Sequence, residues 1–218
     1  DSRLSRGLGD VYKRQINGMD FRYISVGDID NDGDLDIVSG SNTHSSSATE
    51  LGHINLYEND GASDPTWTKT TIDSYIPGYF VELADIDSDG DLDIVSASKN
   101  PYGTTTYIDW YENDGAATWT PAFTAADINI SANVARDLHI ADMDRDGDLD
   151  IVSASSGDNT IAWYENDGAA NPSWTASDIS YTALGPRGIF LADIDSDGDL
   201  DIISASSGDN TIAWYEND

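Results

Sequence analysis

The 218-residue sequence has no cysteine, only six prolines and only ten lysine and arginine residues. A chain of this length buries enough surface to fold without disulfides, so the missing cysteines leave the redox compartment open. The few basic residues stand against 41 Asp and Glu, and the net charge of −31 argues against nucleic-acid or anionic lipid partners. No apolar run approaches the roughly 18 residues of a membrane-spanning helix, so membrane insertion is not expected. With 39% hydrophobic residues, the chain is nevertheless expected to fold.

The sequence repeats itself four times. An Asp-rich nonapeptide begins at Asp28, Asp85, Asp142 and Asp193, at spacings of 57, 57 and 51 residues. A Tyr-Glu-Asn-Asp tetrapeptide follows each nonapeptide, beginning at Tyr57, Tyr111, Tyr164 and Tyr215, and a Trp-Thr pair follows at Trp67, Trp119 and Trp174. Self-similarity at a fixed period indicates a repeat architecture.

Each repeat has the periodicity of short strands. Before each nonapeptide, apolar residues alternate with others, as at Val81 and Leu83, and a small residue such as Gly27 or Ala84 precedes the loop, which indicates a crowded inner strand. A second strand follows the nonapeptide, a third covers 160–164, and a fourth runs from Trp174 to about Ile179. Four antiparallel strands in each repeat predict an all-β protein, a β-propeller of four-stranded antiparallel blades with about four blades present.

The ends of the sequence fit a propeller fragment. Ile16 stands 12 residues before the first nonapeptide, much as Ile72, Ile128 and Ile179 stand 13 or 14 before theirs, so residues 10–16 are expected in the slot of a preceding blade's fourth strand. The terminal strands could close a ring by pairing, or the chain could be an excerpt of a larger propeller, which we favour because the last repeat stops inside a unit. Residues 1–15 match no repeat and are expected to be a non-native or disordered segment before repeats spanning 16–218.

The nonapeptides at 28–36, 85–93, 142–150 and 193–201 carry the chemistry. Asp at loop positions 1, 3 and 5 directs three carboxylates toward one point, Gly at position 6 permits a sharp turn, and a carbonyl at 7 and a carboxylate at 9 complete an oxygen cage. Oxygen ligands without His or Cys select a hard cation, and a flexible loop favours Ca²⁺ over Mg²⁺. About four Ca²⁺ ions, one for each repeat, are therefore expected.

The loop resembles only the first half of an EF-hand. Position 12, where an EF-hand places a bidentate Glu, is Ser39, Ser96, Ser153 or Ser204, and the flanking segments are strands. We therefore expect weak calcium binding, with a dissociation constant on the order of 10⁻⁴ M, so that only extracellular calcium would saturate the sites. The metal would have a structural role, fixing the turn between the first two strands of each blade.

The repeated Asp-x-Asp-x-Asp-Gly-Asp-x-Asp motif, followed by Ile-Val-Ser or Ile-Ile-Ser, resembles the FG-GAP/VCBS repeats of calcium-binding, integrin-α-like propellers. The resemblance covers Phe21 to Asp218. Because the Phe-Gly and Gly-Ala-Pro elements of the integrin form are absent, the bacterial VCBS-like form is the closer match. The resemblance implies that side chains at positions 1, 3, 5 and 9 and the carbonyl at 7 hold Ca²⁺. These residues are Asp28, Asp30, Asp32, Asp34, Asp36, Asp85, Asp87, Asp89, Asp91, Asp93, Asp142, Asp144, Asp146, Asp148, Asp150, Asp193, Asp195, Asp197, Asp199 and Asp201.

Other residue types were weighed as binding groups. Arg22, Arg136 and Arg187 each stand six residues before a loop Asp and either form an anion-binding ring or pair with acidic loops. The pairs at 110–111, 163–164 and 214–215 could stack sugar rings, although adjacent strand residues face opposite sides, so one ring of each pair is expected between blades. His44, His53 and His139 occupy unrelated repeat positions and form no catalytic triad pattern, so we expect surface or strand roles.

Three functional classes remain. The first is a calcium-stabilised, non-catalytic module of a secreted or cell-surface protein that mediates adhesion or binding to an extracellular protein or glycan. The second is the propeller part of a polysaccharide-active lyase or hydrolase, although the visible acidic pairs already have a metal role. The third is a structural spacer. The variable insertions at 42–51 and 99–106 are the best candidates for recognition, since binding residues concentrate on loops of a rigid scaffold.

Overall fold

A computed structural model of the chain describes residues 15–16, 21–41, 52–74, 78–99, 106–115, 125–129 and 132–218. Four antiparallel sheets are built from them. Sheet 1 contains β1 (Phe21–Gly27), β2 (Asp36–Ser41), β3 (Ile54–Asn59) and β4 (Trp67–Asp73), and sheet 2 contains β5 (Gly78–Ala84), β6 (Asp93–Lys99), β7 (Thr106–Tyr111) and β8 (Ala125–Asn129). Sheet 3 contains β9 (Ala135–Ala141), β10 (Asp150–Ser155), β11 (Thr160–Asn166) and β12 (Trp174–Ser180), and sheet 4 contains β13 (Pro186–Ala192), β14 (Asp201–Ser206) and β15 (Thr211–Tyr215).

Every sheet is a meander in which consecutive strands pair in chain order. The expected all-β class is confirmed, and sheets 1 to 3 have the expected four antiparallel strands, while sheet 4 has three. The alternation of apolar residues explains the strands, because the period of two gives each strand two faces with different neighbours. In β9, for example, Leu138 is fully buried, while Asp137 and His139 on either side of it are only partly buried.

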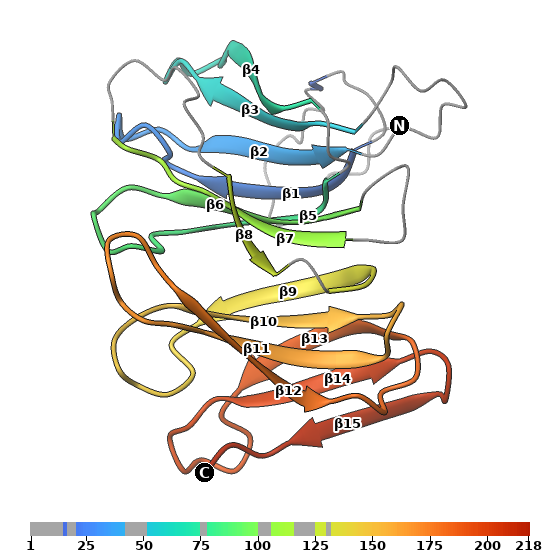
Figure 1. The fold of residues 1–218 in the computed structure, drawn as a ribbon. Coiled ribbons are helices and arrows are strands. Elements are labelled where there is room, and N and C mark those ends of the chain that lie inside the picture. The colour runs from blue at the N-terminus through green and yellow to red at the C-terminus, as the bar shows by residue number, and fades with distance from the viewer. Residues whose placement is uncertain are drawn as a thin grey trace, which may run out of the picture.

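The sheets are stacked in sequence order, from sheet 1 to sheet 4 (Figure 1). The first strands of the sheets form the contact line, since β1 lies against β5, β5 against β9 and β9 against β13. A chain of aromatic rings crosses these strands: Tyr23 to Phe80, Phe80 to His139 and His139 to Phe190, with centroid separations of 4.9, 6.4 and 6.1 Å. The first strand of each sheet is therefore its innermost strand.

A separate apolar cluster fills each junction between neighbouring sheets. Between sheets 1 and 2, for instance, Ile29, Val38 and Leu56 pack with Val81 and Ile94, all at most 2% exposed. Similar clusters join sheets 2 and 3 and sheets 3 and 4. Both faces of the inner sheets are thus buried, and the core of the protein consists of these layers between sheets.

The small residue at the end of β1 is required by close packing, as expected for a crowded inner strand. A Cβ atom on Gly27 would lie 2.7 Å from Leu92 Cδ1 and 3.0 Å from Leu83 Cδ1 of the next sheet. Distances below about 3 Å are not tolerated without a shift of the neighbour. Gly27 therefore allows sheet 2 to approach the end of β1.

Some of the sequence predictions fall outside the described residues. These are the character of residues 1–14, the position of Trp119 and of His44, and the conformation of the insertions over 42–51 and 100–105. Gln15 and Ile16 are described and do not form a strand, but Ile16 lines a cavity of about 490 Å³ with Phe21, Ile24 and Tyr57. Ile16 thus lies against the open face of sheet 1, on the side where a preceding blade was expected.

A half-buried acidic group lies where the innermost strands of sheets 2, 3 and 4 meet. Burial, together with the nearby charge of Asp137, raises the pKa of Glu82 to about 7 from its ordinary value of 4.5. His139 Nδ1 is 3.9 Å from Glu82 Oε2, and His139 Nε2 contacts Ile189 O at 3.1 Å. The folded state holds the Glu82 proton more tightly than the unfolded chain, so this group lowers stability as the pH rises from about 4.5 to about 7.

The variant Glu82→Gln should remove this pH-dependent loss. We expect its free energy of unfolding to exceed that of the wild type by about 1–2 kcal/mol near pH 8 and to match it near pH 4.5, since one pKa unit corresponds to about 1.4 kcal/mol. Urea denaturation across this pH range measures the difference, with Asp178→Asn on the exposed strand β12 as the control. An identical pH slope in wild type and Glu82→Gln would show that Glu82 does not titrate in this way.

Candidate metal centre

Each Asp-rich nonapeptide forms the loop between the innermost strand of a sheet and its second strand. In sheet 1, Asp28 directly follows β1 and Asp36 is the first residue of β2, and the other three sheets repeat this arrangement. The two strands pair up to the ends of the loop, with Gly27 opposite Asp36. The loop is therefore fixed at both ends by the sheet, which gives four equivalent sites.

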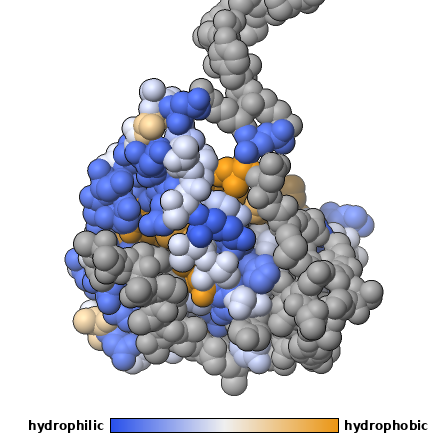
Figure 2. All heavy atoms as spheres, turned by 90° about the horizontal axis from the view of Figure 1, so that it is seen from above, coloured by the Kyte–Doolittle hydropathy of each residue, from blue (hydrophilic) through white to orange (hydrophobic). Residues whose placement is uncertain are grey.

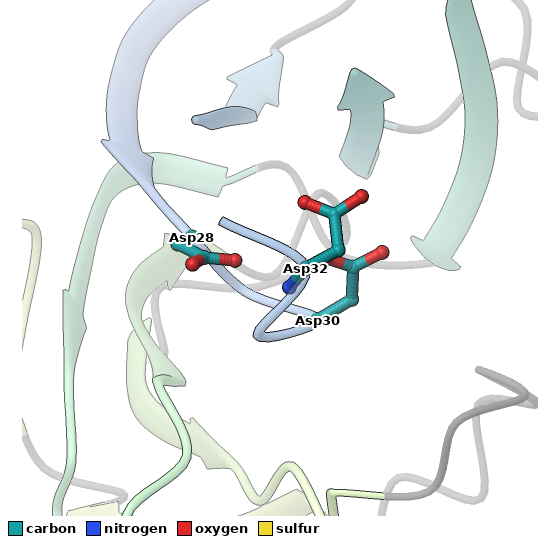
Figure 3. A group of neighbouring side chains, drawn as sticks. All are labelled: Asp28, Asp30 and Asp32. Carbon is teal, nitrogen blue, oxygen red and sulfur yellow. Dashed lines mark hydrogen bonds between the residues drawn. The ribbon is translucent and has the colours of Figure 1, made fainter. Parts of the chain in front are cut away.

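The structure brings together the carboxylates at loop positions 1, 3 and 5, as the sequence predicted. In every repeat one oxygen from each of the three lies within 4.8 Å of the others. Figure 3 shows the group formed by Asp28, Asp30 and Asp32 around the turn of the first loop. The groups are Asp28, Asp30 and Asp32; Asp85, Asp87 and Asp89; Asp142, Asp144 and Asp146; and Asp193, Asp195 and Asp197.

The backbone conformation of the loop produces this convergence. Residues at position 4 have a positive φ of 57° to 68°, and the Gly at position 6 has a φ of 96° to 102°. In the first loop, Gly33 N donates to Asp28 Oδ2 at 3.0 Å, and Asp34 N donates to Asp32 Oδ1 at 2.9 Å. Glycine is the residue type that adopts this φ without strain. It is therefore needed at position 6 for the turn that brings the carboxylates of positions 1 and 5 together.

Several of these carboxylates have an oxygen suited to a cation. Asp28 Oδ1, Asp87 Oδ1 and Asp142 Oδ1 are buried and accept no hydrogen bond within the described part of the chain. A buried oxygen without a donor is costly, and a bound cation would satisfy it. Burial and the charges of Asp36, Asp32 and Asp28 raise the pKa of Asp30, which reflects the same crowding of like charges. The residues present therefore fit a hard metal ion, and each of the four groups could hold one.

Position 9 has a second role that the sequence did not reveal. In the third loop, Asp150 Oδ2 accepts Met143 N at 3.1 Å, and Asp150 Oδ1 accepts Asn166 N at 2.9 Å. The same pair of bonds is made by Asp36, Asp93 and Asp201. This carboxylate joins the start of the loop to the end of the third strand, and it lies outside the 4.8 Å groups. Burial raises the pKa of Asp93 to about 7, against the opposing effect of these backbone bonds.

The side chain at position 7 points toward the turn after the third strand. A Cβ atom on Gly61, Gly115 or Gly168 would collide with the carboxylate of Asp34, Asp91 or Asp148, respectively. These glycines also have a φ of 63° to 66°, so no other residue type fits there easily. The position 7 carboxylate therefore packs against this turn, and the role of its carbonyl group in the cage stays a prediction.

In the second, third and fourth repeats, the Asn of the Tyr-Glu-Asn-Asp tetrapeptide links its repeat to the preceding one, and sequence reasoning missed it. Asn113 Nδ2 donates to Ile29 O at 2.8 Å, Asn166 Nδ2 to Ile86 O at 3.1 Å and Asn217 Nδ2 to Met143 O at 3.0 Å. Each acceptor is position 2 of the loop in the preceding repeat. Each side chain also donates to the position 8 carbonyl of its own loop. The recurrence of the tetrapeptide in every repeat indicated that it has a role. The partners of its Asn could not be predicted, because they lie 74 to 84 residues away in the sequence.

The Glu of the tetrapeptide lies close to the carboxylate groups. Burial, followed by the charges of Asp30, Asp36 and Asp32, raises the pKa of Glu58. In the second repeat, the charge of Glu112 helps to raise the pKa of Asp87. These Glu residues were not among the predicted site residues, but they add negative charge to the surroundings of the first and second loops.

Neighbouring loops also contact each other directly. Asn31 Nδ2 at position 4 of the first loop donates to Asp91 Oδ1 at position 7 of the second loop. Arg145 Nη2 at position 4 of the third loop lies 2.8 Å from Asp199 Oδ1 at position 7 of the fourth. Position 4 and position 7 thus link the first loop to the second and the third loop to the fourth.

Several of the other candidate groups serve packing and strand contacts. Trp110 and Tyr111 are each 1% exposed and belong to different clusters between sheets, so stacking of sugar rings on this pair is ruled out. Arg136 Nε donates to Ser156 Oγ at 3.2 Å, and Arg187 Nε donates to Ser207 Oγ at 2.9 Å. His139 lies on β9, which agrees with its expected strand role.

The Asn that links repeats should contribute measurably to stability. We expect Asn166→Ala to lower the free energy of unfolding by about 1–3 kcal/mol, because it removes the donor to the buried carbonyl of Ile86 and to the partly buried carbonyl of Leu149. Asn59→Ala is the matched control, since among the described residues Asn59 Nδ2 donates to Leu35 O of its own loop and to no other repeat. Denaturant unfolding of both variants tests this, and equal losses would argue against a link between repeats.

Comparisons with known proteins agree with the repeat structure. A family model described as an FG-GAP-like repeat matches three overlapping segments, 28–96, 85–153 and 142–204. Each match begins at the first Asp of one loop and ends in the second strand of the next sheet. No curated protein sequence matches the chain. Among the described residues, no helix is long and apolar enough to cross a membrane.

Proposed function

Because the chain belongs to the FG-GAP-like repeat family, we propose that it is a calcium-stabilised, non-catalytic β-propeller module that binds an extracellular protein or glycan. The four sheets act as blades, and each Asp loop holds one Ca²⁺ ion. The fourfold convergence of three carboxylates, with buried oxygens that lack a donor, is the observation that carries the proposal.

The blade assignment is supported by how the sheets meet. Each sheet is a meander whose innermost strand lies against the innermost strand of the next sheet, and each pair of sheets encloses its own apolar cluster. Each loop connects the first strand of its sheet to the second, so the four loops lie along the same side of the stack. Radial repetition of four-stranded meanders with these features is the arrangement of a propeller.

The choice of Ca²⁺ follows from the donor set. All nearby ligand groups are carboxylate and carbonyl oxygens on a nine-residue loop, and Ca²⁺ accepts six to eight such ligands in flexible geometry, whereas Mg²⁺ requires a stricter octahedron. Asp28, Asp30, Asp32 and Asp36 of the first loop, and their equivalents, would supply side-chain oxygens, and Asp34 would supply its carbonyl. The bound ion would offset the repulsion within the loop and so hold the turn between the first two strands.

The location follows from the affinity. The loop lacks the bidentate Glu of an EF-hand, so its affinity is expected on the order of 10⁻⁴ M, and calcium reaches that level outside cells. FG-GAP-like repeats are typical of extracellular or cell-surface proteins. A strongly acidic protein with its calcium sites filled would be stable there and would lose stability where calcium is scarce.

Calcium should raise the stability of the wild type. The effect of one loop substitution on stability should have opposite signs with and without calcium. At a calcium concentration about 100 times the dissociation constant, each site contributes roughly 2.7 kcal/mol. The variant Asp146→Asn removes one charge from the third loop. We expect it to be at least as stable as the wild type in chelator, because repulsion falls, and less stable in saturating calcium.

Thermal unfolding with calcium and with chelator measures both effects. The control is Asp178→Asn on the exposed strand β12, which removes a carboxylate that lies away from the loops. It should change the unfolding temperature by the same amount with calcium and with chelator. Identical unfolding temperatures of the wild type with calcium and with chelator would contradict a stabilising metal.

The binding function is tested on immobilised glycans and extracellular proteins. We expect the full chain to bind at least one of them at millimolar calcium and to lose that binding when calcium is chelated, because the loops order the surface around them. Binding in neither condition would leave a spacer role and overturn the adhesion proposal. Turnover of an acidic polysaccharide would contradict the non-catalytic assignment.

A further inference from the structure

Arg145 is the single basic residue in the four Asp-rich nonapeptides, each of which contains five Asp. It stands at position 4 of the third loop, between Asp144 and Asp146 of the carboxylate group, and has a φ of 63°. The other loops have a neutral residue at this position, namely Asn31, Ser88 or Ser196. The third loop therefore places one positive charge among the acidic loops.

The guanidinium group of Arg145 lies on the fourth loop. Its Nη2 is 2.8 Å from Asp199 Oδ1 at position 7. A Cβ atom on Gly198 at position 6 would lie 2.7 Å from the same nitrogen, so the cation lies directly against that glycine. A Cβ atom at position 6 of the other three loops would meet no described atom within 4 Å. Among the described residues, this contact with position 6 thus occurs in the fourth loop alone.

The two residues that Arg145 contacts hold carboxylates of the fourth group through their amides. Gly198 N donates to Asp193 Oδ2 at 3.1 Å, and Asp199 N donates to Asp197 Oδ1 at 2.8 Å. Asp193 and Asp197 are positions 1 and 5 of this group. The positive charge therefore lies against the backbone turn that orients two of the predicted calcium ligands.

The second loop has the equivalent contact with a neutral partner. Asn31 Nδ2 at position 4 of the first loop donates to Asp91 Oδ1 at position 7 of the second loop. The nonapeptides at 85–93 and 193–201 are identical in sequence. The two identical loops therefore differ in the charge of the residue that reaches them from the preceding loop.

Screening makes this difference local. Hydrophilic residues make up most of the described surface that is visible from the sheet 1 side (Figure 2), and the chain carries a net charge of −31. The overall negative charge attracts cations to every loop, but at physiological ionic strength the interaction of exposed charges fades beyond about 8 Å. The side chain of Arg145 is 53% exposed and touches the fourth loop, so its charge acts mainly there.

We propose that Arg145 lowers the calcium affinity of the fourth loop, an inference that rests on the proposed function, in which each loop holds one Ca²⁺ ion. Without an ion, the guanidinium group attracts the crowded carboxylates and offsets part of their repulsion. An ion that enters the loop meets a fixed positive charge and binds less tightly. The fourth loop therefore fills at a higher calcium concentration than it would beside a neutral residue.

The first test titrates the metal-free chain with Ca²⁺ in a calorimeter at low ionic strength. We expect one site of Arg145→Gln to bind roughly three- to tenfold more tightly than in the wild type, because a unit charge is removed from beside a divalent ion. Arg145→Lys keeps the charge, so its affinities should match those of the wild type. Arg187→Gln removes the same charge from the far end of β13 and should leave the affinities unchanged.

The second test transfers the charge and assigns the site. Asn31→Arg should weaken one site by a similar factor, because it gives the second loop the neighbour that the fourth loop has. The effect of Arg145→Gln should vanish when Asp193, Asp195 and Asp197 are all replaced by Asn. It should also fall below about twofold near 1 M salt, where the screening length is about 3 Å, which a purely structural role of Arg145 would not explain.

The outcomes separate this inference from the proposed function. If four Ca²⁺ ions bind but Arg145→Gln binds none of them more tightly than the wild type, the inference is overturned and the proposed function stands. A tightening that persists without the fourth carboxylate group, or that Arg145→Lys also produces, would equally overturn it. Absence of calcium binding by the wild type would overturn the proposed function and this inference with it.

Discussion

Repulsion among carboxylates crowded into a nine-residue loop is the constraint on which the rest of this structure depends. Three carboxylates approach within 4.8 Å in each of four loops, and like charges at that distance interact unfavourably even when solvent screens them. The loops meet this cost partly with backbone amides, as Gly33 N does for Asp28. Within the described part of the chain, oxygens such as Asp28 Oδ1 remain buried without a donor, and a bound cation would satisfy them.

The Asp loops and the packing of the sheets form one connected system. The carboxylate of Asp150 accepts the amide of Asn166, whose side chain reaches Ile86 in the loop of the preceding repeat. Arg145 connects the third loop to Asp199 in the fourth. An ion that orders one loop therefore also orders the polar edge of the junction beside it, while apolar clusters fill the remainder. This coupling explains why the Asp loop and the tetrapeptide recur together in each repeat.

The sequence predicted the strands and the acidic groups well, because both depend on local pattern. Alternation around Leu138 identified an innermost strand, and the spacing of Asp28, Asp30 and Asp32 placed three carboxylates on one turn. The roles of Asn166 and of the carboxylate at position 9 were not predictable, since their partners are backbone groups in other elements. The burial of both Trp110 and Tyr111 also depends on having a sheet on each side, which periodicity within one repeat does not reveal.

Titration calorimetry of the metal-free chain with Ca²⁺ tests the central claim most directly, because it counts the ions that the carboxylate groups accept. Four ions bound by each chain, with one fewer in a variant whose third loop has Asn in place of Asp142, Asp144 and Asp146, is the predicted result. Absence of calcium binding at millimolar concentrations by the folded protein would contradict the account, because the loops would then tolerate their own repulsion without a cation.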